Sequence, residues 1–237
     1  MALNIGDAEA ARIRAAEALG LHRELGDAWG VAYSEMMVAN ALAEAGDLAG
    51  AHPLLEESVR AFLKLGDDHY TGVASVNLAW VSGDLGDKDR ERALHEENLG
   101  RARALENRRL EAHSIAQLAM LARDEGRLRE ASTMLKESLR ILRELGDRLE
   151  LAVNLGRLAN VLALAGSVEP AARLLSSSEA LTEEIGASVA WWAGERNDKT
   201  RTIIRGQLGE AAFAEAWEQG RGLTVNEAVA LALDSLE

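Results

Sequence analysis

The sequence predicts an all-α fold, an α-solenoid of helical hairpins stacked one after another. A leucine–glycine–aspartate triplet occurs at 25–27, 65–67 and 145–147, so the copies are separated by multiples of forty residues. A second series with the same period consists of Gly6, Gly46, Gly86, Gly126, Gly166 and Gly206. Between these turns lie segments of about eighteen residues whose apolar side chains have helical spacing. One helical hairpin per forty-residue repeat is therefore expected.

Composition agrees with closely packed helices. The 237 residues are 48% hydrophobic, yet only 4% are aromatic and 2 are proline, so alanine, leucine and valine must build the core. The chain has no cysteine, which excludes disulfides and thiolate metal sites and is typical of a reducing compartment. We see no signal-peptide pattern and no apolar run of membrane-spanning length. These features predict a cytoplasmic protein with no membrane partner.

The net charge of −13 is unevenly distributed. Residues 1–87 carry 5 basic and 14 acidic side chains, whereas residues 88–148 carry 14 and 12. A local basic cluster in that middle part comprises Arg101, Arg103, Arg108 and Arg109. Acidic side chains interleave elsewhere, so direct nucleic-acid contact is not expected. The cluster is either a solvated helix end and turn or a contact for an anion or acidic partner.

The first segment, residues 1–26, is expected to be a half repeat that contains only the second helix of a hairpin. It forms an N-terminal cap or marks a truncation point, and its unpartnered face favours a homo-oligomer. Residues 27–186 then form four hairpins. Asp27, Asp67 and Asp147 are predicted N-caps, whose carboxylates accept hydrogen bonds from first-turn amides.

Two places depart from the repeat. Glu91 and His95 stand where other copies have alanine and leucine, which predicts that this hairpin packs least well or that its second helix, 87–106, is rotated. Residues 187–237 are expected to form a degenerate fifth hairpin plus a capping helix. Its turn is predicted at Gly206, and Trp191 and Trp192 are expected to pack this hairpin. The final helix, 228–236, follows a capping-box spacing at 224–227.

Within each hairpin the small and large residues resemble the tetratricopeptide repeat. The fourth copy carries the resemblance in Leu158, Ala159, Leu162, Gly166, Ala171 and Leu175. Alanines at the crossing positions let paired helices approach closely, while leucines fill the space around them. The period of 40 exceeds the usual 34 of that family, which lengthens each helix by most of a turn. The resemblance implies a right-handed superhelix whose concave side is lined by the first helix of each hairpin.

Carrying the family's inward positions onto this chain selects a candidate groove. Its predicted peptide- or ligand-binding residues are Tyr33, Met36, Asn40, Val73, Val76, Trp80, Asp84, His113, Met120, Arg123, Val153 and Asn160. Asn40, Trp80, Met120 and Asn160 form one stripe at the forty-residue period, combining amides with an aromatic ring and a thioether. A methionine or tryptophan on a helix can equally be a core residue, so both interpretations stay open.

The sequence lacks the common motifs of phosphate binding, catalysis and metal binding. The sequence has no phosphate-binding loop, no His-Glu-x-x-His pair and no metal-ligand spacing among its five histidines, so no enzyme, cofactor or metal is expected. Residues 216–228 resemble the close of helical sensor arrays in large bacterial ATP-dependent transcription regulators. The leading hypothesis is a module that binds a protein or peptide, as the sensory or assembly part of a bacterial signalling or regulatory protein. A small-molecule sensor using the same groove is the alternative, and an all-helical enzyme a remote one.

Overall fold

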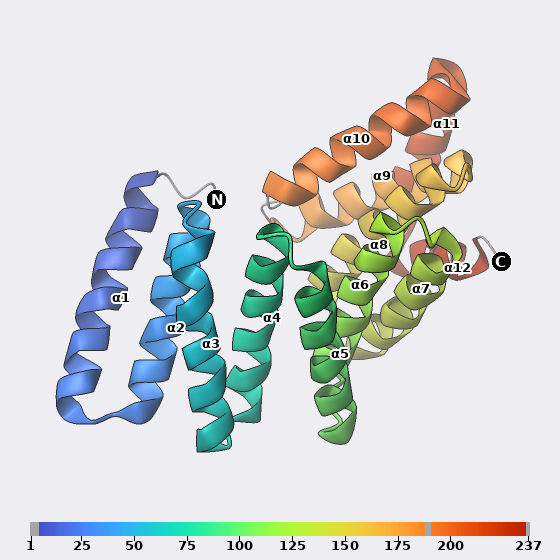
Figure 1. Cartoon of the computed structure of the whole chain (residues 1–237). Helices are drawn as coiled ribbons and strands as arrows, with labels where there is room; N and C mark the ends of the chain where they lie inside the picture. The colour runs from blue at the N-terminus through green and yellow to red at the C-terminus, as the bar shows by residue number, and fades with distance from the viewer. Residues whose placement is uncertain (1–4, 188–190, 236–237) are drawn as a thin grey trace. The chain divides into compact units, whose positions relative to one another are not determined.

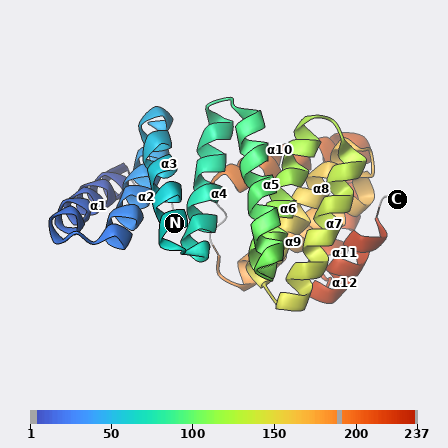
Figure 2. The same cartoon turned by 60° about the horizontal axis from the view of Figure 1, so that its bottom comes forward.

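The computed structural model describes the backbone of residues 5–187 and 191–235. Side chains are described for residues 13–187 and 194–235. The described residues form twelve α-helices and no strand, which confirms the all-α fold (Figures 1 and 2). The helices are α1 Ile5–Leu25, α2 Ala28–Glu44, α3 Leu48–Leu65, α4 Asp68–Asp84, α5 Lys88–Ala104, α6 Arg108–Asp124, α7 Leu128–Leu145, α8 Arg148–Leu164, α9 Val168–Glu184, α10 Trp191–Leu208, α11 Glu210–Arg221 and α12 Val225–Asp234.

The chain divides into two compact units, residues 2–101 and 102–237. The division falls within α5, so that helix begins in the first unit and ends in the second. In the first unit α1 packs against α2, α2 against α3, and α3 against α4. In the second, α6 packs against α7, α7 against α8, and α8 against α9. Each of these helices contacts its neighbour along the chain, as expected of an array of hairpins.

The turns follow the glycine and aspartate pattern of the sequence. Gly66 ends α3 in the left-handed region with φ 72°, a conformation that costs a side-chain-bearing residue energy. Asp67 then caps α4, its carboxylate accepting from Tyr70 N at 3.0 Å. Asp27 and Asp147 cap α2 and α8 in the same way, which confirms the predicted N-caps. The exception is Glu106, which occupies a glycine position and adopts φ 53°.

Small residues occupy the crossing positions of the hairpins. The alanines that the sequence places there are fully buried: Ala39, Ala79, Ala119 and Ala159. Leu55, Leu135 and Leu175 on the second helices are also fully buried. The fourth hairpin adds Leu158 and Leu162 to this core. Removal of these side chains from water supplies most of the driving force for packing.

A buried hydroxyl links the two helices of three hairpins. Ser58 Oγ donates to the Ala32 carbonyl oxygen at 2.9 Å, and Ser138 Oγ donates to that of Ala112 at 2.8 Å. Ser178 Oγ makes the same bond to Ala152 at 2.7 Å. Asn98 occupies the equivalent position of α5 and is buried. Its amide nitrogen and oxygen have no hydrogen-bond partner among the described residues.

The environment of Glu91 shows how the irregular copy accommodates it. The carboxylate lies against Gly83 of α4, where a Cβ would come within 2.2 Å of Glu91 Oε2, and it pairs with Lys88 at 2.8 Å. A glycine thus leaves the space that the larger residue fills. His95 is almost completely buried. The predicted weak packing of this part stays a prediction.

The C-terminal helices depart from the preceding hairpins. In the second unit α10 lies against α8 and α9, α11 against α9, and α12 against α7, α8 and α9 (Figure 1). The turn predicted at Gly206 is wrong: α10 continues to Leu208, and the break occurs at Gly209, where φ is 76°. Gly209 provides the left-handed conformation that a turn needs, whereas Gly206 is accommodated within the helix.

The capping box at the last helix is confirmed. Glu227 N donates to Thr224 Oγ1, and the Glu227 carboxylate accepts from Thr224 N at 2.8 Å. The helix begins at Val225, three residues earlier than predicted, because the box places Thr224 at its N-cap. The predicted roles of Trp191, Trp192 and Leu236 lie outside the described side chains. Among the described helices, none is long and apolar enough to cross a membrane.

Candidate functional site

The twelve predicted groove residues lie on the first helices of the hairpins, three on α2, four on α4, three on α6 and two on α8. We call these twelve positions the predicted binding face. The α2 and α4 members belong to the first unit, and the α6 and α8 members belong to the second.

In the first unit a side-chain amide pair joins α2 to α4. Asn77 Nδ2 donates to Asn40 Oδ1 at 3.0 Å. Trp80, one turn after Asn77, is 41% exposed, and Met37, one turn before Asn40, is 38% exposed. Large apolar side chains are thus accessible on either side of the amide pair along the helices. This arrangement offers both hydrogen-bonding groups and apolar surface to a ligand.

The other predicted residues of the first unit differ in accessibility. Met36 is buried in the core, while Val73 and Val76 are half-buried and Asp84 is exposed. Tyr33 is half-buried and stacks on Trp29, with ring centroids 5.3 Å apart and an interplanar angle of 8°. Met36 therefore contributes to packing, and Tyr33 belongs to an aromatic cluster. That cluster consists of Trp29, Tyr33, Phe62 and Tyr70.

In the second unit hydrogen bonds connect α6, α8 and α10. Arg123 Nη1 donates to Asn160 Oδ1 at 3.0 Å, and Asn160 Nδ2 donates to Thr200 Oγ1 of α10 at 2.9 Å. Asn160 is 6% exposed, so its amide is engaged within the array. Arg157 Nη2 donates to Gln117 Oε1 at 3.4 Å. Helix α10 therefore covers Asn160 of the predicted binding face.

His113, Met120 and Val153 are half-buried. His113 Nε2 lies 3.2 Å from Gln117 Nε2. Burial, together with the positive charge of Arg157, lowers the pKa of His113 to about 4. The imidazole is consequently neutral at physiological pH. The ring is thus engaged in packing and in a contact with Gln117.

Two buried arginines have lowered pKa values. Burial lowers the pKa of Arg157 to about 10, with the Glu150 carboxylate opposing the shift and the Arg123 charge adding to it. Burial also lowers the pKa of Arg196, on α10, to about 9, assisted by Arg157 and Arg123. The guanidinium groups therefore act on one another through unfavourable electrostatics.

Sequence reasoning missed Asn77, Gln117 and Arg157. These residues share one place in the forty-residue repeat, three positions before the stripe of Trp80, Met120 and Asn160. The signal was a polar residue recurring one turn from that stripe. This position is not among the family's inward positions, so the resemblance alone does not predict it.

The basic cluster is engaged in ion pairs. Arg101 pairs with Glu97 at 3.1 Å, and Arg103 pairs with Glu111 at 3.2 Å. The two remaining arginines pair with acids as well: Arg108 with Glu111 and Glu144, and Arg109 with Asp147. The cluster thus has the character of a solvated helix end and turn, with its charges balanced by neighbouring carboxylates.

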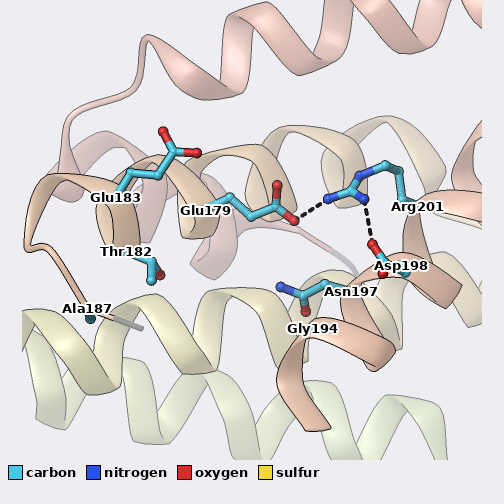
Figure 3. A pocket seen from close by; sticks show the side chains of 8 residues that line it. All are labelled: Glu179, Thr182, Glu183, Ala187, Gly194, Asn197, Asp198 and Arg201. Carbon is cyan, nitrogen blue, oxygen red and sulfur yellow. Dashed lines mark hydrogen bonds and ion pairs between the residues drawn. The ribbon is translucent and has the colours of Figure 1, made fainter. Parts of the chain in front are cut away.

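A pocket of about 220 Å³ lies between α9 and α10 (Figure 3). It is lined by Glu179, Thr182, Glu183, Ala187, Gly194, Asn197, Asp198 and Arg201. The Arg201 guanidinium is held by Glu179 at 2.6 Å and Asp198 at 2.7 Å, so its charge is satisfied internally (Figure 3). Within the described residues, no group of three or more potential metal ligands occurs.

Comparisons with known proteins bear on the fold. Residues 108–184 match the family model of the tetratricopeptide repeat. No curated protein matches the sequence. The structure of BtubC (BKLC) from P. vanneervenii is similar, with a TM-score of 0.69 and 16% identity over 97% of this chain and 93% of that one.

Two structures of a putative kinesin light chain from Podosopora anserina, with nearly identical TPR-like repeats, are also similar. One has a TM-score of 0.57 and 20% identity over 80% of this chain and 92% of that one. The other has a TM-score of 0.55 and 19% identity over 86% and 97%. Identities this low bear on the fold alone. Residues 108–184 thus match the tetratricopeptide repeat family, and the chain has the fold of TPR-like helical arrays.

Proposed function

We propose that the chain is a protein-interaction module that binds an extended peptide on the α2 and α4 part of the predicted binding face. The observation that carries this proposal is Trp80, 41% exposed one turn from the Asn40–Asn77 amide pair. An aromatic ring can hold an apolar side chain of the peptide, and the amides can pair with its backbone.

Charge suggests which peptides fit. Glu44 and Asp84, the last residues of α2 and α4, are both exposed. The C-terminal ends of helices also carry a partial negative charge. The preferred ligand is therefore an extended segment with an apolar residue against Trp80 and a basic residue directed towards Glu44 and Asp84. Such charge complementarity contributes to specificity and association rate.

The wider context is part of the same proposal. We assign the module to the sensory or assembly part of a bacterial signalling or transcription-regulatory protein in the cytoplasm, without catalytic activity of its own. The resemblance of residues 216–228 to sensor arrays of ATP-dependent regulators supports this context. The TPR-like fold supports the interaction role.

The proposal is tested with the full chain and peptides selected from a random display library. Trp80→Ala should weaken binding of a selected peptide by about 2 kcal/mol or more, because an anchor residue dominates such interfaces. Asn77→Ala should weaken it by a smaller amount. Isothermal titration calorimetry measures both.

Leu63→Ala is the matched control, since Leu63 is a large apolar residue of similar exposure on α3. It should leave peptide affinity unchanged. Reversal of Arg108 and Arg109 to glutamate should alter mainly the salt dependence. If binding survives Trp80→Ala and Asn77→Ala but is lost with the arginine reversal, the proposed face is wrong.

A further inference from the structure

The pocket between α9 and α10 contains a buried amide whose donor is unused. Asn197 of α10 is 7% exposed and lines the pocket. Its Oδ1 accepts a long hydrogen bond from Arg196 Nη2 at 3.4 Å, while its Nδ2 makes no hydrogen bond among the described residues. Figure 3 shows this nitrogen pointing from α10 towards Thr182 and Glu179 of α9. A buried donor without a partner costs stability, so the amide is suited to an acceptor that enters from outside.

Hydrogen-bond acceptors line the α9 wall of the pocket. Glu179 is the most buried of the lining carboxylates, with 19% of its side chain exposed, whereas Glu183 and Asp198 are exposed. Thr182 Oγ1 donates its own proton to the Ser178 carbonyl oxygen at 2.8 Å, which leaves the hydroxyl oxygen as an acceptor. Thr182 and Glu183 also belong to the last turn of α9, where a helix carries partial negative charge. The pocket thus has a donor on one wall and acceptors on the other.

The charges of the lining favour a cationic ligand. Arg201 is shared by Glu179 and Asp198, and Glu183 pairs with Arg221. Three carboxylates of the pocket therefore have two guanidinium groups as their partners. Burial raises the pKa of Glu179 even though the charge of Arg201 opposes the shift, so this guanidinium does not fully offset the cost of burying the carboxylate. A ligand with one positive charge supplies the missing counterion.

The size of the pocket restricts the ligand to a small one. Its volume of about 220 Å³ is below the roughly 300–1,000 Å³ of pockets that hold drug-sized ligands. Gly194, near the start of α10, lines the pocket, and a Cβ added to it would meet no atom within 4 Å. The space beside this glycine is therefore open to a compound of a few non-hydrogen atoms.

We propose that this pocket binds a small primary ammonium compound that also carries a carbonyl oxygen, as an aminoacyl amide does. The ammonium group donates to the Glu179 carboxylate and to Thr182 Oγ1, and the carbonyl oxygen accepts from Asn197 Nδ2. A free amino acid fits less well, because its carboxylate would be repelled by Glu183 and Asp198. The site belongs to the second unit and does not depend on the peptide binding proposed for α2 and α4.

The test uses the full chain labelled with ¹⁵N and glycinamide as the probe, at neutral pH and constant ionic strength. Glycinamide should shift the side-chain amide resonance of Asn197 in a saturable manner. Two compounds of similar shape each lack one of the required groups: propionamide lacks the ammonium group, and isobutylamine lacks the carbonyl oxygen. Each should bind at least tenfold more weakly than glycinamide. No saturable shift with glycinamide, or equal affinity for either analogue, would overturn the proposal.

A charge-removing variant locates the ammonium group. Glu179→Gln should raise the dissociation constant of glycinamide at least tenfold, because the amide no longer offers a negative charge. Glu184→Gln is the matched control, since Glu184 lies on the same helix, is exposed and does not line the pocket. It should bind glycinamide as the unaltered chain does. Equal affinities in these two variants would exclude Glu179 as the ammonium partner.

A pocket-filling variant tests the site without weakening the fold. Gly194→Leu should abolish glycinamide binding by occupying the open space. It should not lower the thermal unfolding midpoint, because the added side chain meets no atom and leucine favours a helix more than glycine does. Gly206→Leu is its control, since Gly206 lies on α10 in equally open space and does not line the pocket. Equal glycinamide affinity in the two leucine variants would show that the ligand binds elsewhere.

Discussion

At the scale of single residues, a buried hydroxyl joins the second helix to the first in three of the hairpins. Ser58, Ser138 and Ser178 each donate to a carbonyl 26 residues earlier in the chain. The side chain is short enough to fit between closely packed helices and long enough to reach the backbone. Asn98 occupies the same place with a larger amide that finds no hydrogen bond among the described residues. A buried amide of this kind costs stability.

The Asn98→Ser substitution should therefore stabilise the chain, by about 1 kcal/mol, through removal of an unsatisfied amide and formation of the repeat's usual bond. Ser138→Ala is the reciprocal change and should cost about 1 kcal/mol. Urea denaturation monitored by circular dichroism measures both. A loss of stability in Asn98→Ser would show that the amide has a partner in solution that the serine cannot replace.

A second residue-scale prediction concerns His113 and acid. Its pKa of about 4 lies below the ordinary value of 6.5, so the folded state favours the neutral imidazole. The resulting stability is full above pH 6.5 and is lost as the pH falls towards 4, by on the order of 3 kcal/mol. The groups facing the ring are Gln117, by direct contact, and Arg157, by its charge.

His113→Asn should flatten this dependence. The difference in unfolding free energy between pH 7 and pH 5 should be smaller in the variant than in the unaltered chain. Carboxyl groups titrate in both proteins, so the comparison isolates the histidine. Identical pH profiles would mean that the imidazole titrates with the same pKa in the folded and unfolded states.

At the scale of elements, the repeat predicts helices well and the C-terminal arrangement poorly. Leucine and alanine at helical spacing, together with Asp67 and its equivalents, predicted the all-α fold and the caps, because those features act within one hairpin. The break at Gly209 was missed because two glycines three residues apart are equivalent in sequence, and packing against α8 and α9 selects between them. The same packing places Thr200 where it accepts a hydrogen bond from Asn160. No local sequence pattern predicts this contact, because the two residues belong to different hairpins.

Helix α5 should be the first hairpin helix to open. Its buried face includes Asn98 without hydrogen bonds, and Glu91 replaces the alanine that is fully buried at Ala51, Ala131 and Ala171. Few apolar contacts lower the free energy of local opening. Amide exchange followed by mass spectrometry should therefore show weaker protection in α5 than in α7.

The same experiment on Asn98→Ser provides the control. Protection in α5 should rise while that in α7 stays unchanged, because the new hydrogen bond acts within the first unit. Uniform protection of α5 and α7 in the unaltered chain would show that Gly83 and the Lys88 ion pair compensate fully for Glu91.

At the scale of the whole molecule, helix α1 presents apolar surface that the first unit leaves uncovered. Leu21 and Leu25 are 60% and 78% exposed, and Ile13 is also exposed. Leu19 faces the opposite way and is buried. Exposed large apolar residues on one helix often mark a contact with another chain. We therefore predict that two copies associate through α1, since a symmetric dimer lets one patch cover its own equivalent.

Analytical ultracentrifugation over a range of concentrations tests this association. The unaltered chain should sediment as a dimer at the highest concentrations and dissociate on dilution. Ile13→Glu combined with Leu21→Glu should yield a monomer throughout, because each buried pair of carboxylates would oppose the contact. Leu85→Glu, at an exposed leucine between α4 and α5, should leave the equilibrium unchanged. A monomer at every concentration, or equal dissociation by Leu85→Glu, would rule out α1 as the contact surface.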